Sequence, residues 1–235
     1  MKELLKLMNQ RQSDRVPFDR TRKVPDSELR LILEAGRWAP TVHNMQNFQV
    51  VVVDDRIVLS AIEAVSLPIS ETFLRENYQQ LSASEEELAR KKVGLLATMF
   101  PHSMRTSRAE APLKAGCLLP APQLLFLLYD PRTRAPASEG DFLGIMSIGC
   151  VMENMWLAAH SLGISFHVET GMGAPEPARE IRKILGIPQE LRIAFVARLG
   201  YPAKSVGRYL RVRRDIEDFA HRNGYGSPFG NKPAE

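Results

Sequence analysis

The chain has 235 residues, of which 44% are hydrophobic and 25% are charged, a size that suits one sizeable core and is short for two domains. Lys and Arg exceed Asp and Glu by 31 to 27, and this net charge of +4 does not by itself indicate a nucleic-acid partner. The two cysteines form no CxxC pair, no signal peptide is visible, and prolines interrupt the longest apolar run. We expect a cytoplasmic protein with no membrane partner.

Hydrophobic periodicity predicts helices that alternate with strands along the chain. Apolar residues at 4, 5, 7 and 8 indicate a first amphipathic helix, and a second begins near Asp26. Apolar and β-branched runs predict four strands, at 48–53, 124–129, 164–168 and 191–199. A helical pattern at 176–185 lies between the last two strands and ends at Gly186, a residue favoured just after a helix.

The most apolar helix is predicted at 147–162. Ile148, Val151 and Met155 recur at steps of three and four residues, while Trp156 makes another side of the helix apolar. A helix that is apolar nearly all round is buried in a core or between subunits. We therefore expect it at the centre of the molecule or at a subunit interface.

Two segments fall outside this alternation. Residues 57–112 mix charged helical patterns with aromatic and methionine side chains, and we interpret them as an inserted helical flap, because long excursions between core elements are often lids. The candidate acceptor contacts in this flap are Phe73, Tyr78, Phe100 and Met104. The end of the chain, 227–235, is expected to be a loose tail.

Two local motifs carry candidate binding chemistry. Arg11, Ser13 and Arg15 in RQSDR offer two guanidinium groups and a hydroxyl, which suit a phosphate, although an ordinary charged helix end has the same composition. Asn44 and Gln46 lie in the loop before the first strand. Their amides match the donor and acceptor edges of a flat heterocycle such as a flavin, or they cap neighbouring backbone.

The segment GMGAPE, at 171–176, follows a strand and precedes a helix, where a dinucleotide-binding loop would lie. Glu176 stands at the third glycine position, and its charge opposes a pyrophosphate, so these glycines instead allow the backbone to approach a planar ligand. The five histidines show no metal-ligand spacing, and no phosphate-binding loop or nucleophile elbow is present. We expect no metal.

Taken together and in order, several segments resemble the nitroreductase-like flavoprotein family. They are RQSDR with Phe18 beyond it, ILEAGRWAPTVHNMQNF, GCVMENMWLAAHSLGI, VETGMG, LGYP and RVRRDIEDF. The resemblance covers roughly the first fifty and the last ninety residues, and the spacing of several weak motifs is more specific than any one of them. It implies an α+β fold with a central, mainly antiparallel sheet flanked by helices, as one domain over 1–226 that carries the flap and forms an intertwined homodimer.

The resemblance also implies roles for individual residues. It puts Arg11 and Ser13 on the phosphate and ribityl chain of FMN, and Arg15 beside the N1 and C2 carbonyl edge of the flavin ring. It places the backbone of a strand end near flavin N5, at Glu169, Thr170 and Gly171. The further FMN-binding residues that it implies are Pro40, Thr41, Val42, Asn44 and Gln46, which reach the flavin of the other subunit, and Arg211 and Arg213 at the phosphate.

The activity implied by this resemblance is an FMN-dependent oxidoreductase that accepts hydride at flavin N5 from NAD(P)H, a transient donor. The electrons would pass to a small, electron-poor acceptor such as a nitroaromatic or a quinone. Reductive dehalogenation and flavin-consuming chemistry are alternatives within the same superfamily. A nucleic-acid-binding or regulatory module, based on the basic clusters near both ends of the chain, is the alternative from another class.

Overall fold

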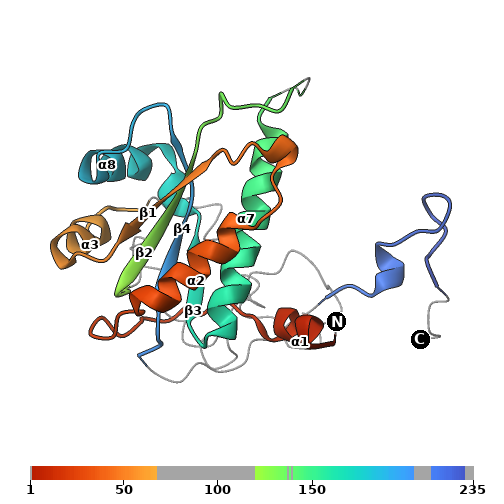
Figure 1. Cartoon of the computed structure of the whole chain (residues 1–235), viewed down its shortest axis with the longest axis horizontal. Coiled ribbons are helices and arrows are strands. Elements are labelled where there is room, and N and C mark those ends of the chain that lie inside the picture. Colours follow the sequence, from red (N-terminus) through yellow and green to blue (C-terminus); the bar gives the residue numbers. More distant parts are fainter. Residues whose placement is uncertain (1, 68–119, 137, 139, 204–212, 231–235) are drawn as a thin grey trace, which may run out of the picture. The chain divides into compact units, whose positions relative to one another are not determined.

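The computed structural model of the protein describes residues 2–67, 120–136, 138, 140–203 and 213–230 (Figure 1). The chain divides into two units, 1–68 with 115–206 and 69–114 with 207–235. The first unit holds the sheet and its flanking helices, and the second holds the short helix η4 (Ile216–Asp218).

A four-stranded sheet forms the centre of the first unit. Its strands are β1 (Phe48–Val53), β2 (Gln123–Tyr129), β3 (Ser165–Glu169) and β4 (Arg192–Gly200). They lie in the order β1-β2-β4-β3, and each neighbouring pair is antiparallel. All four strands begin and end within one residue of the predicted bounds, and the α+β fold with an antiparallel sheet is confirmed.

Helices cover both faces of this sheet (Figure 1). On one face α2 (Asp26–Arg37) and α7 (Phe142–Ser161) pack against Leu125 and Leu127 of β2. On the other face α3 (Arg56–Glu63) and α8 (Pro175–Leu185) pack against the alternate residues of the same strand. Strand β2 is buried along its whole length because it has a sheet neighbour on each edge and helices on each face.

Helix α7 begins at Phe142, five residues before the predicted start at 147. The predicted start was too late: Ser147 lies inside the helix, where its hydroxyl donates to the carbonyl of Leu143 at 2.9 Å. Among the described residues α7 alone has the length and apolarity of a membrane span. Val151 and Ala159 are fully buried in the core, which explains that composition without a membrane.

Helix α1 and the end of helix α8 follow the sequence pattern. Helix α1 (Lys2–Gln10) is amphipathic and has no buried residue, and α8 ends at Gly186, whose φ of 63° is left-handed as predicted. Residues 57–63, expected in the insertion, belong to α3, and the flap from 68 to 112, with Phe73, Tyr78, Phe100 and Met104, lies outside the described residues.

Backbone hydrogen bonds link the last described residues of the second unit to residues a few positions earlier. The amide of Phe229 donates to the carbonyl of Ala220 at 2.9 Å, and that of Arg222 donates to Ser227 at 2.8 Å. Ser227 and Phe229, in the expected tail, therefore form backbone hydrogen bonds, and residues 231–235 lie outside the described residues.

Candidate functional site

Arg11 is the first residue after α1, and its side chain lies along the middle of α7. Its Nε is 3.1 Å from a carboxylate oxygen of Glu153, and its guanidinium carbon is 4.2 Å from the centre of the Trp156 ring. The side chain is only 20% exposed, and Nε makes no hydrogen bond of good geometry to a described residue. A cation held in this way beside α7 is a candidate ligand for an anion such as a phosphate.

The next residues run across the start of β3. Asp14 accepts hydrogen bonds from the Gln12 amide, at 3.0 Å, and from the hydroxyl of Ser165. Ser13 and Arg15, on either side of Asp14, are half-buried. The carboxylate of Asp14 thus attaches the RQSDR segment to the sheet.

The far end of β3 carries the predicted catalytic backbone. Glu169 is the last residue of the strand, and Thr170 and Gly171 follow it as exposed residues that lead into the short helix η3 (Gly171–Gly173). A Cβ added to Gly171 would meet nothing within 4 Å, so its backbone is open to a ligand. Met172 is fully buried and anchors the turn.

The charge of Arg15 acts on the carboxylate of Glu169 at this strand end. Burial raises the pKa of Glu169, but His167, Arg198 and Arg15 outweigh that effect and hold the pKa below its ordinary value. The structure therefore brings together Arg15 and Glu169, two residues that the sequence analysis assigned to one flavin ring.

The loop before β1 is conformationally strained. His43, Asn44 and Gln46 have φ angles of 51°, 54° and 45°, a region that side chains other than glycine seldom adopt. Such backbone costs about 1–3 kcal/mol per residue and is concentrated at functional sites. The strain supports a binding role for this loop.

Internal hydrogen bonds hold the strained loop in place. The Gln46 amide donates to Asn44 at 3.0 Å, and the Gln46 backbone N–H donates to the hydroxyl of Thr41 at 3.2 Å. The backbone N–H of Val42 donates to the hydroxyl of Ser147 on α7, at 3.0 Å. Pro40, Asn44 and Gln46 are exposed, as expected for residues that reach a ligand held elsewhere.

The loop and the RQSDR segment meet α7 at different points. Ser147 contacts the loop and Glu153 contacts Arg11, and these two residues lie six positions apart, roughly 9 Å along a helix. Arg213 belongs to the second unit, and Arg211 lies outside the described residues.

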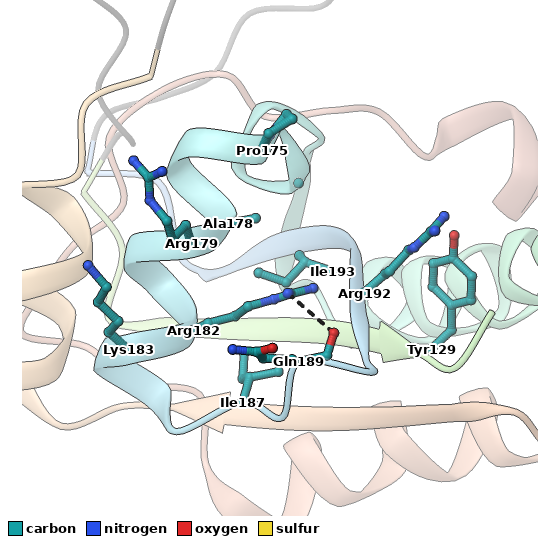
Figure 2. Close-up of a pocket in the computed structure, with 11 residues that line it drawn as sticks. Tyr129, Pro175, Ala178, Arg179, Arg182, Lys183, Ile187, Gln189, Arg192 and Ile193 are labelled. Carbon is teal, nitrogen blue, oxygen red and sulfur yellow. Dashed lines mark hydrogen bonds between the residues drawn. The ribbon is translucent and has the colours of Figure 1, made fainter. Parts of the chain in front are cut away.

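A separate cavity of about 780 Å³ lies between α8 and the start of β4 (Figure 2). Figure 2 shows Arg179 and Lys183 extending from one side of α8, while Arg182 extends from the other side toward Arg192. Arg182 already donates to the backbone carbonyl of Gln189. Arg179 and Lys183 thus point away from Arg182, and the lining includes no predicted site residue, so the cavity is a weaker candidate than the RQSDR region.

Sequence reasoning missed two residues of the buried polar cluster beside Glu169. His167 is 6% exposed on β3, and Arg198 is fully buried opposite it on β4. A charged residue inside the apolar run AFVARLG, and the alternation of His167 with Glu169 along one strand, were the available signals.

Comparisons with known proteins agree on one family. A sequence model described as the nitroreductase family matches residues 8–201. A protein of Archaeoglobus fulgidus, provisionally named an NADH dehydrogenase/NAD(P)H nitroreductase, is 26% identical over 222 residues, which are 94% of this chain and 98% of that protein.

Solved structures show the same fold. A nitroreductase with bound FMN from Bacteroides fragilis is 21% identical with a TM-score of 0.58, over 94% of this chain and 99% of that chain. Another with bound FMN, from Desulfitobacterium hafniense, is 23% identical with a TM-score of 0.59, over 94% and 98% of the two chains.

Proposed function

The chain belongs to the nitroreductase family and is an oxidoreductase, and on that premise we propose that it uses FMN to pass electrons from NAD(P)H to a small, electron-poor acceptor. The observation that carries this proposal is the family match over residues 8–201, joined to the cationic RQSDR segment beside the open strand end. Bound FMN in the Bacteroides fragilis and Desulfitobacterium hafniense structures supports the choice of cofactor.

The residues of this chain fit an FMN molecule in two places. Arg11 and Ser13 would hold the phosphate and ribityl chain, since a guanidinium and a hydroxyl are strong donors to phosphate oxygens. Arg15 would lie at the N1 and C2 carbonyl edge, and the backbone from Glu169 to Gly171 near N5. FMN would supply the hydride and electron transfer that side chains do not provide.

The protein's own contribution is anchoring and electrostatics. The positive charge of Arg15 would favour negative charge at the N1 edge of the ring, which raises the midpoint potential of the flavin. Glu153 already pairs with Arg11, so a phosphate bound there would share this cation with a carboxylate. Removing Glu153 would then tighten the binding of FMN.

A second copy of the chain would complete the site. The first turns of α7 expose Phe142, Ile145 and Met146, at 65%, 48% and 51%, and α1, which packs on α7, exposes Leu4 and Leu5. Exposed apolar side chains in such groups are candidates for burial in a subunit interface. In the proposed homodimer, the strained loop at 40–46 would reach the flavin held by the partner's RQSDR segment.

The proposed acceptors are nitroaromatics and quinones, which are flat and accept electrons readily. Residues 68–112, where acceptor contacts or features of a dehalogenase would lie, are outside the described residues, and no observation favours those alternatives.

Anaerobic spectroscopy tests the proposed activity. NADH or NADPH should bleach the visible flavin band of the purified protein, and a nitroaromatic or quinone added afterwards should restore it. If neither nucleotide bleaches the flavin band within times longer than ordinary turnover, electron transfer from NAD(P)H to the flavin is contradicted.

A further inference from the structure

Arg198 places a positive charge inside the first unit. Its side chain is completely inaccessible to solvent, although it lies on a strand whose other buried residues are apolar. Burying a guanidinium is costly unless its N–H groups find partners. The partners of Arg198 therefore indicate what this charge does.

Two of those partners are backbone carbonyls, one within the RQSDR segment and one in the residue that follows it. Nη1 donates to the carbonyl of Val16 at 3.1 Å, and Nη2 donates to the carbonyl of Asp14 at 3.3 Å. These two carbonyls belong to the residues immediately before and after Arg15. One planar guanidinium thus binds the backbone on both sides of Arg15, the residue proposed to contact the flavin.

The remaining contacts of Arg198 lie on β3. Nη2 is 2.8 Å from Nδ1 of His167, its register partner on β3, and Nε is 3.5 Å from a carboxylate oxygen of Glu169. The same guanidinium therefore touches both parts of the proposed site, the RQSDR segment and the strand end.

His167 is in contact with two groups through one ring nitrogen. Its Nδ1 is 2.8 Å from Arg198 and 3.0 Å from Glu169, and it can only accept from the first or donate to the second. Burial lowers the pKa of His167, which favours the neutral ring, and its tautomer decides which of the two contacts becomes a hydrogen bond. In either tautomer Arg198 lies beside Glu169 and bonds to the backbone around Arg15.

We propose that Arg198 is a positioning residue that fixes Arg15 relative to the end of β3, and so sets how strongly Arg15 acts on the flavin. This inference rests on the proposed function. A long arginine side chain on a free segment would sample many positions, and anchoring the backbone on both sides of it removes much of that freedom. Arg198 itself would touch neither flavin nor substrate.

The test compares Arg198→Met with the matched control Arg182→Met. Arg182 also donates to two backbone carbonyls, those of Gln189 and Leu191, but it lies on α8 beside the separate cavity. Both variants lose comparable arginine-to-backbone bonds, and only Arg198→Met should affect the flavin. Arg198→Lys keeps a charge but cannot bridge both carbonyls, so it should change the flavin in the same direction and serves if Arg198→Met does not fold.

Hydrogen exchange in flavin-free protein gives the first readout. The amides of Phe18 and Asp19 are bonded to the carbonyls of Pro120 and Tyr201, and they report on opening of the segment next to Val16. Arg198→Met should speed their exchange by about tenfold or more, because it removes at least one charge-assisted hydrogen bond. Arg182→Met should leave the exchange of these amides unchanged. Equal exchange in the two variants would overturn the anchoring role.

The midpoint potential of bound FMN gives the second readout. Arg198→Met should lower it, and the shift should vanish when Arg15→Gln is already present, because the effect acts through Arg15. An equal shift in both backgrounds would overturn positioning through Arg15. A wild-type protein that takes up no FMN would overturn the proposed function instead, and the exchange experiment, which needs no flavin, separates that failure from a failure of the anchor.

Discussion

Gly36 of α2 faces Met155 of α7 so closely that a Cβ on Gly36 would lie 2.8 Å from Met155 Cγ. The two helices pack at this point over the face of the sheet that carries Leu125 and Leu127. A glycine inside a helix normally costs stability relative to alanine. Here the close approach of the helices gives the glycine a packing role.

Gly36→Ala should therefore destabilise the protein. Overpacking costs about 1–3 kcal/mol, and the gain in helix propensity offsets about 1 kcal/mol of that, which leaves a net loss of about 1 kcal/mol. In a Met155→Ala background the obstruction is gone, and the same substitution should become neutral or stabilising. Urea unfolding of the four proteins measures this reversal, and a loss of the same size in both backgrounds would rule out the steric explanation.

Asp55 caps helix α3 and should contribute more to the free energy of unfolding than the neighbouring Asp54 does. Its carboxylate accepts from the backbone N–H groups of Ile57 and Val58 at 2.9 and 3.0 Å. Asp55→Ala should cost about 1 kcal/mol of unfolding free energy. The control is Asp54→Ala, which removes only an exposed ion pair with Lys23 and should cost less than about 0.5 kcal/mol. Equal losses would argue against the cap.

The buried His167 should make stability depend on pH. Its folded pKa is lowered, chiefly by burial, from an ordinary value of 6.5, while Arg198, Glu169, Arg15 and Asp14 lie around the cluster. As the pH falls the unfolded chain takes up the proton first, so this contribution is present above about pH 6.5 and is lost below it.

The measurement is the free energy of unfolding between pH 7.5 and 5.5, above the range in which carboxylates titrate. His167→Gln should show a smaller loss over this interval than the wild type does. A steeper loss in the variant would mean that His167 is stabilised in its charged form.

Subunit mixing tests whether two chains share each site. Arg15→Gln and Asn44→Ala should each impair activity, because one chain supplies Arg15 and its partner supplies Asn44. When the two variants are unfolded together and refolded, about half of the dimers are mixed, and each should hold one site with both residues intact. Roughly a quarter of wild-type activity should return. Mixed dimers that form, as seen by native mass spectrometry, but stay inactive would place both residues in one chain's site.

Much of the fold was predictable because it depends on local patterns. The strand at 48–53 and the stop at Gly186 follow from side-chain type and backbone preference alone. The start of α7 was not predictable, because Ser147 has the composition of a cap but bonds within the helix. Only the packed structure shows which use a serine hydroxyl takes.

The candidate site was predictable in part, for a similar reason. Short-range motifs drew attention to Arg11, Arg15 and Asn44. Arg198 was missed because its meaning depends on carbonyls 182 and 184 positions away in the sequence, which only the fold brings within reach. The strained backbone of the loop at 40–46 is likewise invisible in residue types that tolerate many conformations.

The most direct test of the central claim is the visible spectrum of the freshly purified protein, followed by identification of what it releases on denaturation. We expect a flavin absorption band, release of FMN and not FAD, and restored binding when FMN is added back to the stripped protein. Arg11→Ala should weaken that binding by about tenfold or more, as the loss of a charged hydrogen bond to phosphate. A colourless protein whose spectrum does not change when FMN is added would contradict the account.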